Sequence, residues 1–202
     1  MAGKNMVYMV FAAVSLVLLY AGWKLTSRNA YESAKYSVVK IEENIEVRAY
    51  PDLMMATTDY QPRLGNNGSF GRLFQYISGG NKSNQKIAMT TPVIMQPGSS
   101  REQGAMSFVL PEKVAGTNIP QPESKRVTLN KRPEGLFAVI RFSGRDEQEL
   151  IAKQSALLKE WILDNHYEMI AEPEFAGYDP PWTPAPLRRN EILIRIQLST
   201  QP

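Results

Sequence analysis

The order strand, helix, strand, strand occurs twice along the chain, and this repetition constrains the fold more than any other feature of the sequence. Apolar residues that alternate with period two predict the strands, which in chain order are 45–50, 53–60, 93–96, 106–110, 136–142 and 192–198. Apolar residues at helical spacing predict helices at 70–77 and 146–165. We therefore expect an α+β fold in which the strands of two such units join into one antiparallel sheet or a distorted antiparallel β-barrel, with the two helices packed outside.

The first helix has sequence signals at both ends and one apolar face. Ser69 offers an N-cap hydroxyl after a Gly-rich loop, and Gly79-Gly80 favours the end of the helix. Four residues at helical spacing form the apolar stripe: Phe70, Leu73, Phe74 and Ile77. We expect the two aliphatic members to pack on the sheet, whereas the two aromatic members suit a flat ligand.

The length of 202 residues and the charge pattern restrict the class of protein. One full-size domain fits this length, with a linker between its halves expected at 111–125, which is rich in Pro, Gly and polar residues. Of the 23 basic and 20 acidic residues, three basic ones precede Glu32, which leaves 20 of each sign. A neutral domain lacks the basic surface that supplies most nucleic-acid affinity, so we expect no nucleic-acid partner.

An uncharged segment of 18 residues runs from Met6 to Trp23 near the N-terminus. This length is near the lower limit for a helix that crosses a bilayer. A removed signal peptide is the alternative, but Leu19 and Tyr20 stand where its cleavage site needs a small residue. We expect an uncleaved membrane anchor. The expected division of the chain is a membrane anchor or signal segment (1–28), a linker (29–35) and one domain (36–200).

The side of the membrane on which the domain lies is open to two interpretations. Positive charges that follow the uncharged segment outnumber those that precede it, which by the positive-inside rule would keep the domain in the cytoplasm. A bacterial-style signal anchor would instead place the domain outside. We expect the outer, periplasmic face.

The chain offers few residues for nucleophilic or metal chemistry. It has no cysteine, and His166 is its only histidine. A lone histidine after a helix is more often solvated or capping than an axial haem ligand. Carboxylates are scattered next to basic residues, so no catalytic constellation is visible. The methionines of the domain suit core packing, and also a pocket for a large, flat, apolar ligand.

Three motifs follow one another along the chain. The first is IEVRAYP at 45–51. The second is FGRLFQYISGGN at 70–81, which continues to KIAMTTPV at 86–93. The third is AGYDPPW at 176–182, followed by RRNE at 188–191. Together they resemble the SOUL haem-binding proteins over about residues 36 to 198.

The resemblance implies a duplicated α+β barrel that binds haem or another porphyrin non-covalently. In the family the ligand lies between the first helix and the Pro-rich C-terminal loop. Carried over by position, the implied contact residues are Asn67, Phe70, Phe74, Gln75, Gly177, Trp182 and Thr183. The axial ligand of the iron is left open.

Four positions depart from the family pattern. Phe70 and Phe74 stand at Met positions of the helix, and the aromatic rings keep a surface on which a macrocycle can stack. Some members have lysines, which suit haem propionates, where this chain has Gln75 and Thr183. Arg72, Arg188 or Arg189 would then have to take their place. We expect a tetrapyrrole carrier or buffer at a membrane surface rather than an enzyme. The alternatives are an enzyme that modifies or degrades a tetrapyrrole, and an interaction domain that has kept the fold without the ligand.

Overall fold

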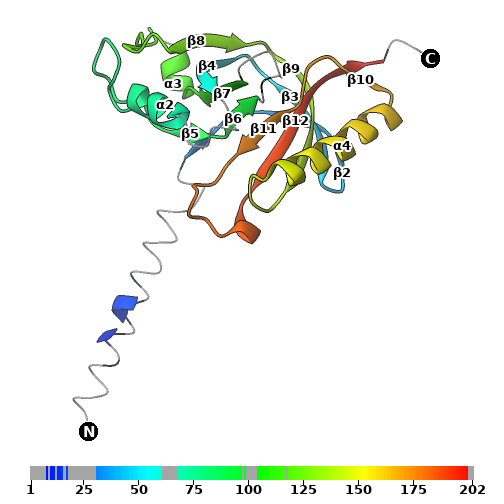
Figure 1. Ribbon diagram of the computed structural model, residues 1–202, viewed down its shortest axis with the longest axis horizontal. Helices are drawn as coiled ribbons and strands as arrows, with labels where there is room; N and C mark the ends of the chain where they lie inside the picture. Colours follow the sequence, from blue (N-terminus) through cyan, green and yellow to red (C-terminus); the bar gives the residue numbers. More distant parts are fainter. Residues whose placement is uncertain are drawn as a thin grey trace.

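The computed structural model describes residues 31–60, 68–96, 98, 104–116 and 118–199, together with residues 8, 10, 11, 13–15 and 17. The strands are β1 (Glu32–Ser33), β2 (Ser37–Glu42), β3 (Ile45–Tyr50), β4 (Leu53–Tyr60), β5 (Thr90–Thr91), β6 (Val93–Gln96), β7 (Gly104–Val109), β8 (Val127–Arg132), β9 (Gly135–Phe142), β10 (Tyr167–Met169), β11 (Glu174–Gly177) and β12 (Asn190–Leu198). The helices are α2 (Ser69–Ile77), α3 (Glu112–Ala115), α4 (Gln148–Asp164) and the short 3-10 helix η3 (Ala185–Leu187). Figure 1 shows α2 and α4 at opposite ends of one large twisted sheet.

The strand order of the large sheet relates two similar units. The order is β2-β3-β9-β12-β11-β6-β7-β4-β8, with β10 paired to β12, and every pairing is antiparallel. The unit β4-α2-β6-β7 and the unit β9-α4-β11-β12 arrange their strands alike, and they meet where β6 pairs with β11. In addition, β3 of the first half pairs with β9 of the second unit, and β8 of the second half pairs with β4 of the first unit. Each unit is therefore extended by a strand from the other half of the chain.

The expectation of a barrel is wrong, because the sheet stays open between its end strands β2 and β8. The sheet nevertheless curls, since strands distant in the order share one buried cluster inside it. That cluster combines Tyr50, Leu53, Met55, Ile94, Val109, Phe137, Val139, Ala176, Tyr178 and Leu193. The side chains of this cluster fill the interior of the curled sheet, so the end strands β2 and β8 do not pair with each other.

Two other clusters lie on the outer face of the sheet, and each is covered by one helix. Leu158 and Ile162 of α4 pack with residues of β3, β9, β11 and β12. Leu73, Tyr76 and Ile77 of α2 pack with residues of β4, β7 and β8. The expectation of two helices outside the sheet is therefore confirmed.

The N-terminal expectations lie largely outside the described residues. Of the expected anchor segment, 6–23, only seven scattered positions are described. Within the described part of the chain, no helix is long and apolar enough to cross a membrane. The described part of the expected linker, 31–35, contains β1, which pairs in parallel with β5.

Candidate functional site

Helix α2 presents an aromatic pair on its outward face. Its inner residues Leu73 and Ile77 are buried, whereas the side chains of Phe70 and Phe74 are 44% and 50% exposed. The two phenyl rings are nearly parallel, with an interplanar angle of 12° and centroids 6.1 Å apart. The edge of Phe70 also meets the Phe108 ring, whose centroid lies 5.2 Å away. The division of the stripe into an aliphatic core side and an exposed aromatic side is as expected.

The start of α2 differs from the expected cap. Gly68 is the N-cap residue and adopts a left-handed conformation with φ of 75°, which favours glycine. Ser69 is already helical, and its hydroxyl donates to the Asp59 carbonyl oxygen at 2.7 Å. The Ser69 N-cap prediction is therefore wrong, because this hydroxyl fastens the helix to β4 instead. Gln75 is exposed on the helix, and Asn67 lies outside the described residues.

The other predicted contacts lie in and before the β11–β12 loop (residues 178–189). Gly177 ends β11, Trp182 is 69% exposed, and Thr183 is half-buried. Arg188 makes two hydrogen bonds within the loop: its Nε donates to the Thr183 carbonyl at 2.8 Å, and its Nη2 donates to the Pro181 carbonyl. Among the described residues, no hydrogen bond or ring contact joins this group to the aromatic pair of α2.

The three arginines considered as partners for propionates are all held by the protein itself. Arg72 donates to the Thr58 hydroxyl at 3.0 Å and pairs with Asp59 at 3.2 Å. Arg188 is bonded to the loop carbonyls. Arg189 pairs with Glu191 at 2.7 Å. Each of these three side chains is therefore already engaged in contacts within the protein.

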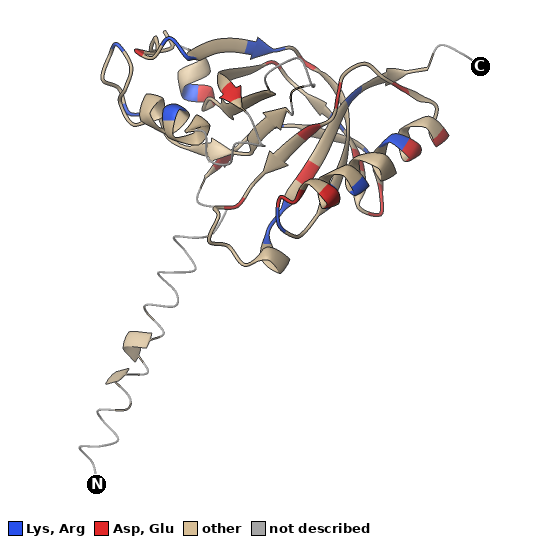
Figure 2. Cartoon of the chain, viewed as in Figure 1, with Lys and Arg blue, Asp and Glu red and all other residues tan. Residues whose placement is uncertain are grey.

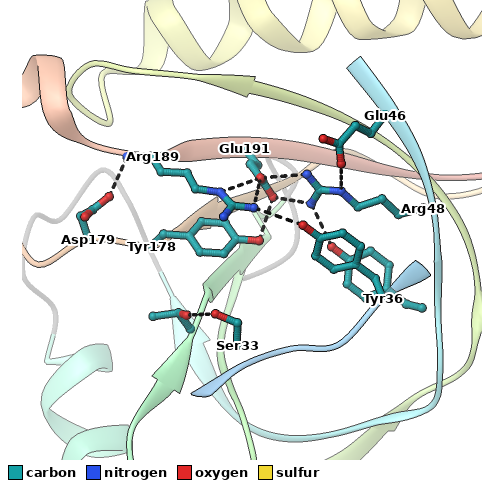
Figure 3. Close-up of polar contacts among 10 residues, drawn as sticks. Ser33, Tyr36, Glu46, Arg48, Tyr178, Asp179, Arg189 and Glu191 are labelled. Atoms are coloured by element: carbon teal, nitrogen blue, oxygen red, sulfur yellow. Dashed lines mark hydrogen bonds and ion pairs between the residues drawn. The ribbon is translucent and has the colours of Figure 1, made fainter. Parts of the chain in front are cut away.

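A buried ionic cluster connects β3 with the end of the β11–β12 loop (Figure 3). The Glu191 carboxylate accepts hydrogen bonds from Arg48 at 2.8 and 3.0 Å, from Arg189 at 2.7 and 2.9 Å, and from the Tyr178 hydroxyl at 2.8 Å. The side chains of Arg48 and Glu191 are 1% and 0% exposed. Sequence reasoning missed this cluster.

The charges of the cluster stabilise one another against burial. Burial alone would raise the pKa of Glu191, but the hydrogen bonds and charges of Arg48 and Arg189 hold that pKa below its ordinary value. Burial likewise opposes the charge of Arg48, yet Glu191 raises the pKa of its guanidinium. Burial raises the pKa of Tyr178 well above its ordinary value, so this hydroxyl stays a donor. Glu46, which pairs with Arg48 at 2.6 Å, supplies the second negative charge and balances the two arginines.

A second buried ion pair crosses the interior of the curled sheet. Arg132 of β8 meets Glu174 of β11 at 2.8 Å, and both side chains are at most 10% exposed. The Arg132 guanidinium also lies 4.0 Å from the centre of the Phe137 ring. Burial lowers the pKa of Arg132. The Gln96 amide donates to the other Glu174 oxygen at 2.7 Å. Within the described part of the chain, the three buried side-chain nitrogens of Arg132 and the Oε2 of Glu174 have no hydrogen-bond partner.

A cavity of about 600 Å³ lies between α4 and the outer face of β6, β11 and β12. Its walls are mainly apolar and include Met95, Ile151, Phe175 and Ile192. One basic and three acidic residues supply charge at its lining: Lys159, Asp146, Glu172 and Glu174. The volume lies within the range of small-molecule pockets. No motif pointed to this cavity, because its walls come from segments that are far apart in the sequence.

His166 follows α4, with a φ of 61° that places it in the left-handed region. Its backbone closes the turn into β10, since its N–H donates to the Leu163 carbonyl at 3.2 Å. The helices α2 and α4 lie at opposite ends of the sheet (Figure 1), so His166 is remote from the aromatic pair. Among the described residues, no group of three or more His, Cys, Asp or Glu could hold a metal ion.

Solved structures share this fold at low sequence identity. The C-terminal domain of EcmrR aligns with a TM-score of 0.54 and 12% identity, covering 81% of this chain and 98% of that one. EcmrR in a complex with DNA gives a TM-score of 0.57 and 11% identity, covering 96% and 68%. A hydrolase from Listeria innocua gives 0.53 and 10%, covering 79% and 94%. At these identities the likeness concerns the fold alone.

The sequence itself identifies the family. Among curated proteins no significant relative was found. The family model described as SOUL heme-binding protein matches residues 31–195, which is most of the chain and includes all three motifs. The chain therefore belongs to the SOUL heme-binding family.

Proposed function

We propose that this protein binds haem or a related porphyrin non-covalently and acts as a carrier or buffer rather than an enzyme. The observation that carries the proposal is the exposed, nearly parallel pair Phe70 and Phe74 on α2 of a SOUL-family chain. Two large aromatic side chains that stay half exposed offer a flat apolar face on which a macrocycle can stack.

The surroundings of the aromatic pair offer apolar contact to the porphyrin ring. Among the residues that the structure describes, they offer neither an unoccupied arginine for the propionates nor a histidine for the iron. Arg72, Arg188 and Arg189 are bonded within the protein, and His166 lies at the far end of the sheet. Binding then depends on apolar contact and not on an axial histidine. A metal-free porphyrin would bind nearly as well as haem.

A titration of hemin into the chain lacking residues 1–28 tests the proposal. Phe74→Ala removes half of the aromatic pair, and we expect the dissociation constant to rise roughly 5- to 150-fold, equivalent to about 1 to 3 kcal/mol. Leu163→Ala is the matched control, because Leu163 is 63% exposed on α4, away from the pair. We expect this control to bind hemin like the parent.

A urea melt on the same variants separates binding from folding. Leu73 is fully buried, so Leu73→Ala should cost about 2 to 5 kcal/mol of stability, and Phe74→Ala clearly less. If Phe74→Ala binds hemin like the parent but melts as early as Leu73→Ala, then Phe74 belongs to the core and the pocket lies elsewhere.

The cavity beneath α4 is the other place where a porphyrin could lie. Ala152 lines it, so Ala152→Phe would fill part of the space. Loss of hemin binding in Ala152→Phe, with normal binding in Phe74→Ala, would move the site to this cavity. Absence of saturable binding in the parent would favour an interaction domain without ligand. Decay of the haem absorbance with a reductant and oxygen would favour an enzyme.

We also propose that residues 6–23 tether the domain to a membrane, with the domain on the outer face. The support is the uncharged stretch of 18 residues. Nucleic acid is not the proposed partner, because basic and acidic residues are interspersed over the domain (Figure 2). Protease treatment of intact cells, with and without permeabilisation, tests the orientation.

A further inference from the structure

The β11–β12 loop presents two large apolar side chains to solvent in a fixed conformation. Trp182 is 69% exposed and Leu187 is 64% exposed. The two bonds from Arg188 hold the loop, and the Thr183 N–H donates to the Pro180 carbonyl at 3.0 Å. A rigid loop that keeps a tryptophan and a leucine in water indicates a surface that contacts something apolar.

The loop lies where the chain enters the domain from its N-terminal side. Arg189, at the end of the loop, donates to the Tyr36 hydroxyl at 3.5 Å. The same tyrosine ring lies 4.2 Å from the Arg48 guanidinium of the buried cluster. In Figure 1 the loop, with η3, forms the lower edge of the domain.

The distance to the uncharged N-terminal segment is limited by chain length. Only residues 24–30 separate Trp23 from Tyr31, the first residue that the family model matches. Seven residues span at most about 25 Å when fully extended. A segment 6–23 embedded in a bilayer would therefore keep this edge of the domain close to the lipid surface.

The composition of the loop suits the lipid headgroup region. Tryptophan favours that region because its ring is apolar and its indole N–H can still donate a hydrogen bond. Four prolines, at 180, 181, 184 and 186, have no N–H to desolvate when the loop leaves water. The acidic side chain of Asp179 is occupied, because it accepts the Arg189 N–H at 2.6 Å.

We propose that the β11–β12 loop docks on the lipid bilayer through Trp182 and Leu187, as a second membrane contact beside the N-terminal segment. This inference rests on the proposed membrane tether. The docking fixes the orientation of the domain, so that the loop edge faces the lipid.

The three tryptophans of the chain allow a direct test on the full-length protein in phosphatidylcholine vesicles. Three variants each keep one tryptophan and replace the other two by phenylalanine, leaving Trp23, Trp161 or Trp182. Lipids brominated near the headgroup or near the chain end quench tryptophan at the matching depth. We expect Trp182 to be quenched most by bromines near the headgroup. Trp161 of α4 is the matched control, because its ring stacks on Tyr167 with the centroids 6.2 Å apart, and we expect no quenching there.

The Trp23 variant distinguishes failure of the tether from failure of the loop inference. If Trp23 is not quenched, the segment is not in the bilayer and the proposed tether fails. If Trp23 is quenched while Trp182 behaves like Trp161, the docking of the loop is refuted. Leu187→Asp in the Trp182 variant should reduce the quenching of Trp182. The same substitution in the Trp23 variant should leave the quenching of Trp23 unchanged.

Discussion

Glu191→Gln is expected to be among the most destabilising single changes in this domain. The carboxylate accepts five hydrogen bonds from Arg48, Arg189 and Tyr178. A glutamine keeps only one acceptor oxygen. Its NH₂ group is itself a donor and would face the N–H and O–H groups that bonded the other carboxylate oxygen. Arg48 is 1% exposed, so water cannot replace the lost partner. Removal of one member of a buried pair costs about 3 to 5 kcal/mol, a large share of the roughly 5 to 15 kcal/mol typical of a domain.

Urea unfolding followed by circular dichroism at neutral pH measures this change. Glu46→Gln is the matched control, because Glu46 also pairs with Arg48, at 2.6 Å, but is 28% exposed. We expect the control to lose about 1 kcal/mol or less. Equal effects of the two substitutions, or a loss below about 1 kcal/mol for Glu191→Gln, would refute the assignment of Glu191 as the centre of the cluster.

The free-energy difference of unfolding between the parent and Glu191→Gln is expected to depend on pH. The pKa of Glu191 is lower in the folded chain than its ordinary value of 4.5, so its stabilising effect is present above that pH. The effect is lost as the pH falls through the lowered folded-state pKa. The stability difference between the parent and Glu191→Gln should therefore be constant from pH 7 to about pH 5 and shrink in stronger acid. A difference that is unchanged down to the acid unfolding of the parent would contradict this.

Three further results are expected. Removal of residues 1–28 should leave a soluble, folded domain by gel filtration and circular dichroism, and aggregation of the truncated chain would count against it. His166→Ala should keep hemin affinity and the Soret band, with protoporphyrin IX binding within about threefold of hemin; a tenfold loss, about 1.4 kcal/mol, would show that the histidine matters. Gly144→Ala should cost about 1 to 3 kcal/mol in a urea melt, since Gly144 has a φ of 131° and an added Cβ would lie 2.7 Å from Leu150; an unchanged midpoint would contradict this.

The regular elements with one buried face could be predicted from the sequence. Strand β4 has the predicted bounds, Leu53–Tyr60, and α4 ends within one residue of its predicted end. Strands β2 and β8 were missed for physical reasons. All but one of the six residues of β2 are exposed, so it has no buried face to give an apolar period. Strand β8, Val127–Arg132, has only two apolar residues, Val127 and Leu129, and the three residues after them are polar or charged, so the alternation is too short to predict a strand.

The buried ionic cluster could not be predicted from alternation. Ile45 and Val47 point to the outer face under α4, and period two then places Arg48 on the opposite face, which is typically solvent in a half-buried strand. Here the curl of the sheet buries that face as well. Glu191 is 143 residues away, and a single sequence gives no sign that the two groups meet. The aromatic face of α2, by contrast, depends only on spacing within one helix.

The exchange of β3 and β8 between the two units has a consequence for how the chain folds. Neither half contains all the strands that its own sheet needs, because β9 requires β3 and β4 requires β8. Many native contacts therefore join residues that are far apart in sequence, which slows folding and couples the halves into one cooperative transition. The two repeated units therefore cannot fold independently of each other. A cut of the chain within 111–125 would leave two fragments that fold only together.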